Sequence, residues 1–115
     1  MLNIFGGVRR NTKLRDEVII TFILEGGNLD ALHSLEKELD DCLNDSDVGY
    51  HDGHETPMAD DSNEETFLFF YGANAEKLFI TIHPILKSNP IIQRAKANLT
   101  FVKPDESRQQ IEVDI

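Results

Sequence analysis

Two different hydrophobic patterns follow one another in the first half of the chain. The run Val18–Leu24 is apolar on both faces of a strand apart from Thr21, a pattern typical of a strand inside a sheet. Asn28, a residue type that favours helix N-caps, is followed by leucines at three- and four-residue steps from Leu29 to Leu43. This spacing predicts an amphipathic helix of about four turns, with Glu36 and its acidic neighbours on the polar face.

A second strand and a loop are predicted between this helix and the middle of the chain. The segment Val48–Glu55 has a strand-like pattern that two glycines interrupt. Residues 56–65 are polar and acidic and include Pro57, so they predict an acidic loop. The following run, Thr66–Gly72, is rich in Phe and Tyr and is the strongest strand pattern in the chain.

The last third predicts one more helix and two more strands. Asn74 is placed to cap a helix whose apolar stripe ends before Pro90. Pro84 lies inside that stripe and predicts a kink or a new turn, because proline cannot donate to the preceding turn. Ala97–Phe101 and Ile111–Ile115 then alternate between apolar and polar residues, as strands do.

The resulting order, β-α-β-β-α-β-β, predicts an α+β fold. Right-handed crossovers applied to this order give a ferredoxin-like β-α-β-β-α-β sandwich, with both helices on one face of an antiparallel sheet ordered 4-1-3-2. The two most apolar runs then become the central strands. The final strand is an extra C-terminal edge strand beside strand 4. At 115 residues we expect a single domain, 1–115, with residues 1–15 unassigned.

Charge is concentrated in the middle of the chain. Between Glu38 and Glu76 there are twelve carboxylates and no lysine or arginine, and the whole chain has a formal charge of −10. Such a block attracts cationic surfaces or metal ions, and with a pI near 4.6 it excludes nucleic-acid binding. The carboxylates predicted to contact a basic partner are Asp40, Asp41, Asp45, Asp47, Asp52, Glu55, Asp60, Asp61, Glu64 and Glu65.

Other features of the composition predict a cytoplasmic protein that does not contact a membrane. The first residues lack the pattern of a signal peptide, and every apolar run is too short to span a bilayer. Cys42 is the only cysteine, which suits a reducing compartment. It falls on the apolar stripe of the first helix among acidic residues, so we expect an unreactive thiol.

His51-Asp52-Gly53-His54-Glu55 is a cluster of residue types that bind metal ions. Two histidines three residues apart point to opposite faces of a regular strand, and Gly53 could bend the chain enough to bring them together. The cluster suggests a zinc or nickel site with His51, His54 and Glu55 as ligands, to which Asp60 or Asp61 could contribute. The other interpretation is a polar strand end. His33 and His83 are expected on helix surfaces.

The two central strands raise a question about the second face of the sheet. Both strands are apolar on both sides, whereas the predicted fold covers one face with helices. Either the N-terminal segment, with Leu2, Ile4 and Phe5, covers the second face, or that face is an apolar surface open to a homodimer partner.

Three segments resemble a family of small stand-alone bacterial proteins. These proteins pair a D-G-H-E segment with a Y-G-x-x-A-x-x-L-F helix start and a P-hydrophobic-L ending. Here the matches are Asp52–Glu55, Tyr71–Phe79 and Pro84–Leu86, and the similarity covers about Val18 to Phe101. The family has no assigned activity, so the resemblance implies only the fold and a bacterial cytoplasmic origin. Residues 56–65 depart from the shorter, glycine-rich connection expected in the family.

These observations favour a protein-binding function without a cofactor. Small acidic α+β proteins often act as immunity proteins or enzyme inhibitors that fill a basic cleft with carboxylates, an inference from fold-level analogy. The alternatives are a metal- or small-molecule-binding protein centred on His51 and His54, or a protein of another role whose charge maintains solubility. An enzyme is less favoured, because the sequence has no recognisable acid and base pair.

Overall fold

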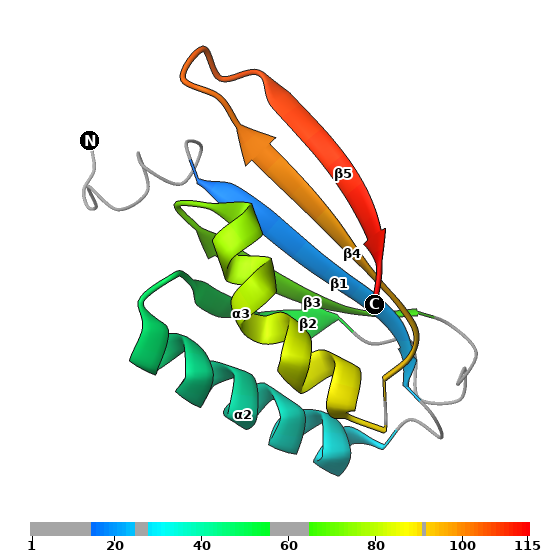
Figure 1. Cartoon of the computed structure of the whole chain (residues 1–115). Coiled ribbons are helices and arrows are strands. Elements are labelled where there is room, and N and C mark those ends of the chain that lie inside the picture. Colours follow the sequence, from blue (N-terminus) through cyan, green and yellow to red (C-terminus); the bar gives the residue numbers. More distant parts are fainter. Residues whose placement is uncertain (1–14, 25–27, 56–64, 91) are drawn as a thin grey trace, which may run out of the picture.

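The computed structural model describes residues 15–24, 28–55, 65–90 and 92–115. Within these ranges five strands form one antiparallel sheet, and two helices lie on the same face of it (Figure 1). This confirms the α+β class. The elements are β1 (Asp16–Leu24), α2 (Leu29–Ser46), β2 (Tyr50–Glu55), β3 (Glu65–Gly72), α3 (Ala75–Ser88), β4 (Ile92–Val102) and β5 (Arg108–Asp114).

The strands are ordered β2-β3-β1-β4-β5 across the sheet. In the antiparallel register, Val18 of β1 lies between Phe70 of β3 and Leu99 of β4. The two most apolar runs of the sequence therefore lie inside the sheet, as their pattern predicts. β5 pairs with β4 and forms one edge, and β2 forms the other.

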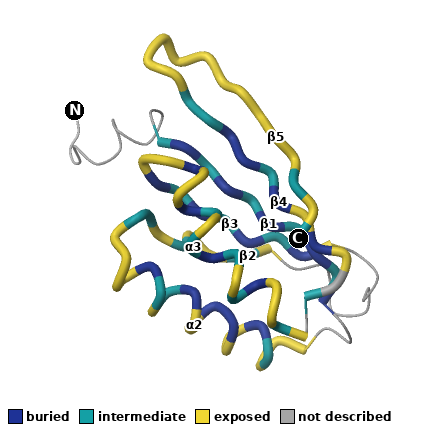
Figure 2. The backbone as a smooth tube through the Cα atoms, viewed as in Figure 1, coloured by how far each residue is buried: buried dark blue, intermediate teal, exposed yellow. Residues whose placement is uncertain are grey.

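The hydrophobic core lies between the sheet and the helices. Along β1, every second residue is buried, and Val18, Ile20 and Phe22 are fully inaccessible to solvent. Figure 2 shows this burial along β1 and β3 and on the inner sides of the helices, whereas most of β5 is exposed. The buried leucines of α2 and the stripe Leu78, Ile82 and Leu86 of α3 complete the core. The inward-facing alternate residues of the strands and the apolar stripes of the helices thus form one apolar layer.

Both predicted N-caps are present. The Oδ1 atom of Asn28 accepts a hydrogen bond from the Ala31 amide at 3.1 Å, and Asn74 accepts one from Lys77 at 3.1 Å. Each bond satisfies an amide that the first helical turn leaves unpaired. α3 contains Pro84 and continues as one helix to Ser88.

The polar face of α2 differs from the prediction at two positions. Glu36 was expected on the solvent face, but it is only 9% exposed. It lies four residues after Leu32 and three before Leu39, so it borders the buried stripe on the side of β2. Leu29, expected on the buried stripe, is 47% exposed in the first turn.

Candidate functional site

β2 is irregular at its centre, and the irregularity changes the direction of a histidine. His51 pairs with Phe70 and His54 with Leu68, so three steps along β2 correspond to two steps along β3. Gly53 adopts a φ of 90°, a conformation that favours glycine. Phe70 and Leu68 both point into the core, so His51 and His54 lie on the helix-covered face. The bend considered at Gly53 is therefore present.

α2 presents three polar side chains to these histidines. His33, Glu36 and Asp40 follow one another at steps of three and four residues, so they share one side of the helix. α2 packs beside β2 along the edge of the sheet (Figure 1). His33 is exposed, Asp40 is half-buried and Glu36 is buried.

Glu36 is the centre of the resulting cluster. Its Oε2 atom lies 2.9 Å from His54 Nδ1 and 3.0 Å from His51 Nε2. The other ring nitrogen of His51, Nδ1, lies 3.1 Å from Asp40 Oδ1. The rings of His33 and His54 have centroids 6.0 Å apart. We call His33, Glu36, Asp40, His51 and His54 the α2–β2 cluster.

His51 lies between two carboxylates, and its polar contacts are only partly satisfied within the α2–β2 cluster. Both of its ring nitrogens face carboxylate oxygens, and its side chain is only 6% exposed. A neutral imidazole has a single N–H, so when Nδ1 donates it to Asp40 the Nε2 atom is left with a lone pair. Among the described residues, the buried Nε2 atom has no partner in hydrogen-bond geometry despite its 3.0 Å approach to Glu36. A cation in the cluster would remove this conflict between lone pairs.

The cluster differs from the metal-ligand set suggested by the sequence. Glu55 is exposed and lies opposite Phe67, on the other face of the sheet from His54. The ligand atoms of His33, Glu36 and His54 lie within 4.8 Å of one another. His33 and Glu36 were missed because they were assigned separately to the helix surface. Their spacing of three residues on a predicted helix was the signal that could have found them.

The predicted partner-binding carboxylates have varied surroundings. Asp40 contacts His51, and Asp41 forms an exposed ion pair with Lys37 at 3.0 Å. Asp60, Asp61 and Glu64 lie outside the described residues. The remaining ones are exposed at the end of α2, on β2 and at the start of β3: Asp45, Asp47, Asp52, Glu55 and Glu65.

The formal charge is distributed unequally between the two edges of the sheet. Residues 28–55, which form α2 and β2, contain one lysine and nine carboxylates, a formal charge of −8 out of −10 for the chain. Residues 92–115, which form β4 and β5, contain four basic and four acidic residues, a formal charge of zero. We call residues 28–55 the acidic edge and residues 92–115 the neutral edge.

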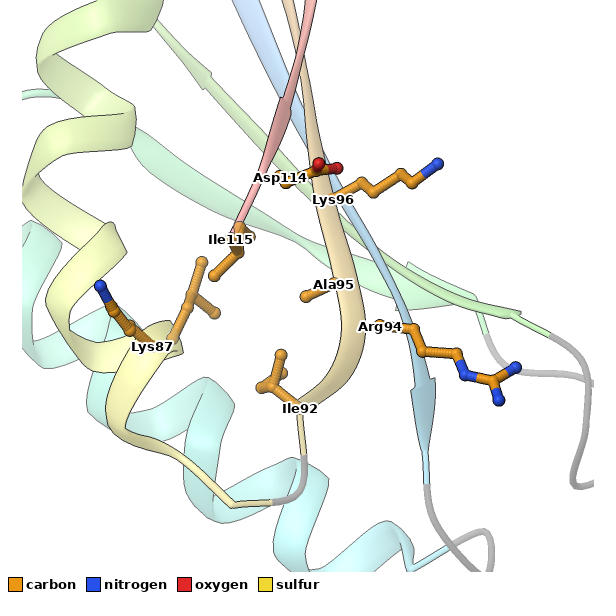
Figure 3. Close-up of a pocket in the computed structure, with 8 residues that line it drawn as sticks. Lys87, Ile92, Arg94, Ala95, Lys96, Asp114 and Ile115 are labelled. Atoms are coloured by element: carbon orange, nitrogen blue, oxygen red, sulfur yellow. The ribbon is translucent and has the colours of Figure 1, made fainter.

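A pocket of about 320 Å³ lies on the neutral edge, between the end of α3, the start of β4 and the end of β5. Its inner wall is apolar, with Ile92, Ala95 and Ile115 pointing into it, whereas Arg94 and Lys96 point away (Figure 3). The charged groups therefore do not converge on a ligand. For this reason we regard the α2–β2 cluster as the stronger candidate site.

Two further predictions concern Cys42 and the second face of the sheet. Cys42 is half-buried, and its Sγ atom lies 3.8 Å from the carbonyl oxygen of Thr81 on α3.

On the sheet face away from the helices, Ile19 and Phe69 are half-buried, and the Phe67 and Phe69 rings stack with centroids 6.4 Å apart. The role of this face in a homodimer stays a prediction. Leu2, Ile4 and Phe5, which were considered as its cover, lie outside the described residues.

No protein-family model, curated protein or solved structure matches the chain. The resemblance to the bacterial family therefore stays a prediction. Neither helix of the described ranges is long and apolar enough to cross a membrane.

Proposed function

We propose that this chain is a cytoplasmic protein-binding module, of the immunity-protein or enzyme-inhibitor type, that places its acidic edge against a basic surface of a partner protein. The observation that carries the proposal is the formal charge of −8 on the acidic edge, whereas the opposite edge of the same sheet is neutral. A one-signed surface attracts a partner of opposite sign and raises its association rate.

The exposure of the carboxylates supports this function. Asp45, Asp47, Asp52 and Glu55 are exposed, and the single lysine of the acidic edge, Lys37, contacts Asp41. An exposed pair of this kind, four residues apart on a helix, contributes only about 0.3–0.5 kcal/mol. Most of the negative field of this edge is therefore available to a partner.

The end of α2 gives the proposal independent support, because its charges oppose folding. The last turn of α2 has no basic residue, although the carbonyl end of a helix favours positive charge. Asp47, which follows the helix, adopts a left-handed conformation with a φ of 56°. An acidic residue in such a place is best explained by a contribution to binding.

The fold that we propose in detail is ferredoxin-like. Read from β4, the first four strands follow the order β4-β1-β3-β2, which supports this topology, with β5 as an added edge strand. In this arrangement α2 and β2 lie together at one edge of the sheet, so their carboxylates lie along that edge, with Glu55 on the sheet face away from the helices.

The test compares two charge-reversed variants with the same net charge. The acidic-edge variant is Glu38→Lys with Asp45→Lys, and the neutral-edge variant is Glu112→Lys with Asp114→Lys. All four positions are exposed. Immobilised wild type and both variants are incubated with extract of the native cells at about 50 mM and about 300 mM salt.

A partner of the proposed kind is retained by wild type and by the neutral-edge variant at low salt. It is lost from the acidic-edge variant and from all three proteins at high salt, because screening weakens contacts between exposed charges. Retention by the acidic-edge variant equal to wild type would exclude this surface. Absence of any retained protein at low salt would contradict the proposed function itself.

A further inference from the structure

We infer that the α2–β2 cluster is a binding site for a divalent transition-metal ion of the zinc type, with His33, Glu36 and His54 as ligands and His51 as a fourth donor. This site is separate from the proposed partner contact in its chemistry and in its test. It differs from the ligand set suggested by the sequence, because two of its ligands come from α2 and Glu55 takes no part.

The distances in the cluster suit a metal ion. The ligand atoms of His33, Glu36 and His54 all lie within 4.8 Å of one another, and His54 Nδ1 is 2.9 Å from Glu36 Oε2. Ligands bonded at about 2.0–2.2 Å lie about 3–3.5 Å apart when adjacent in a four- to six-coordinate shell. The Glu36–His54 distance is therefore already in this range, and the exposed His33 is the ligand that has room to adjust.

His51 provides the second observation. Its side chain is 6% exposed, and its Nε2 atom lies 3.0 Å from Glu36 Oε2 without a hydrogen bond in the described structure. Asp40 accepts from Nδ1 when that nitrogen carries the proton, which leaves the buried Nε2 atom with a lone pair that no described group satisfies. A carboxylate that holds one nitrogen of a histidine while the other binds metal is a recurrent arrangement in metal sites.

The donor set defines the class of ion. Three imidazole nitrogens and one carboxylate oxygen suit borderline ions such as Zn²⁺, Co²⁺ and Ni²⁺. Ca²⁺ and Mg²⁺ take oxygen ligands, so a site dominated by histidine disfavours them. The surrounding field also helps, because the formal charge of −8 on the acidic edge concentrates cations near the cluster.

The local fold explains how these ligands meet. The irregularity at Gly53 turns His54 toward the helices, and the three- and four-residue steps of α2 bring His33, Glu36 and Asp40 to the same side. His33 is exposed, so an ion can enter from solvent without opening the core.

The experiment titrates the full chain with Zn²⁺ in competition with a chromogenic chelator, and separately with Co²⁺ while its visible absorption is recorded. We expect one ion per chain, with a dissociation constant of about 10⁻⁶ M or lower. His33→Ala removes an exposed ligand and should weaken binding at least about tenfold, with unchanged circular dichroism. His83→Ala is the matched control, because His83 lies on α3 and contacts Phe79 outside the cluster.

Bound Co²⁺ should also show the intense visible bands of a site with fewer than six ligands, and His54→Ala should remove them. Binding of more than one ion per chain with no loss in His33→Ala or His54→Ala would mean adventitious binding by surface carboxylates only, and would overturn the inference. Absence of stoichiometric Zn²⁺ binding by wild type would also overturn it. Capture of a partner protein in the presence of a chelator is measured separately. Failure of the metal-site inference can therefore be distinguished from failure of the proposed function.

Discussion

The two edges of the sheet differ in helical cover, charge and chemistry. The acidic edge has α2 packed beside β2, a formal charge of −8 and the α2–β2 cluster. On the neutral edge most residues of β5 are exposed, and basic and acidic residues are equal in number. One sheet therefore has an edge with a formal charge of −8 and the α2–β2 cluster, and an edge with a formal charge of zero.

This difference argues against a charge that serves solubility alone. Solubility requires net charge, and spreading it over both edges would limit repulsion between neighbouring carboxylates. Here nearly all of the excess is placed on one edge, next to three histidines, and the last turn of α2 carries it against the helix dipole. The concentration of charge is thus a local feature that calls for a local role.

The largest expected effect comes from truncating a core side chain on β3, the strand that pairs with β2 of the acidic edge. Phe70 is fully buried on β3, and its ring centroid lies 5.2 Å from that of His51. Phe70→Ala should lower the free energy of unfolding by about 3–5 kcal/mol, because it removes a buried aromatic side chain and leaves a cavity. Urea denaturation measures the change.

The matched substitution on the neutral edge is Ile111→Ala. Ile111 is 43% exposed on β5, so its truncation should lower the free energy of unfolding by less than about 1 kcal/mol. Equal losses in the two variants would contradict the difference in burial between Phe70 and Ile111.

A smaller effect of opposite sign is expected at the end of α2. Asp47 has a φ of 56°, and its amide donates to the Leu43 carbonyl at 3.0 Å. Asp47→Gly should raise the free energy of unfolding by about 0.5–1 kcal/mol, because glycine tolerates this conformation and the change removes a negative charge from the carbonyl end of a helix. Thermal and urea denaturation both measure the gain.

Asp47→Asn separates the two causes. Asparagine also tolerates the left-handed conformation but lacks the charge, so it should give part of the gain, and that part should shrink as salt is added. A loss of stability in both variants would mean that Asp47 supports the fold rather than opposing it.

The smallest expected effect is on the pH dependence of the free energy of unfolding. Partial burial, followed by the nearby Glu17 carboxylate, raises the pKa of Tyr71 above its ordinary value of 10.0. The unfolded chain therefore loses this proton at a lower pH than the folded chain, so the contribution of Tyr71 is present below pH 10 and is lost as pH rises through the folded pKa. Tyr71→Phe should reduce the fall in urea midpoint above pH 10, and an unchanged fall would contradict this assignment.

On the neutral edge, the pKa of Asp105 is shifted downward, so its effect on stability has the opposite pH dependence to that of Tyr71. The hydroxyl and amide of Ser107 hold the pKa of the exposed Asp105 below its ordinary value of 3.8. Its contribution is therefore present above pH 3.8 and is lost as pH falls through the folded pKa. An unchanged acid limb of the stability profile in Asp105→Ala would contradict this assignment.

The sequence predicts much of the fold because its local signals agree with one another. The apolar runs of β1 and β3, the caps Asn28 and Asn74, and the alternation in β5 each specify an element that the structure contains. Boundaries are less well predicted. β4 begins at Ile92 rather than Ala97, because its first residues lack the regular alternation that marks the rest of the strand.

The candidate site could be predicted only in part, because it depends on how α2 and β2 pack together. The sequence points to His51 and His54, and Gly53 suggests the bend between them. It cannot place Glu36 between two histidines, since a carboxylate near the edge of an apolar stripe is normally solvated. Only the packing of α2 beside β2 shows that this side chain is buried.

The central claim is that the acidic edge, and not the neutral edge, is where this protein meets a cationic ligand. The most direct measurement is a set of amide chemical-shift changes in the ¹⁵N-labelled chain, titrated with an octalysine peptide at low salt. We expect changes concentrated in α2 and β2, with little change in residues 92–115. Changes spread equally over both edges, or concentrated on β4 and β5, would contradict it.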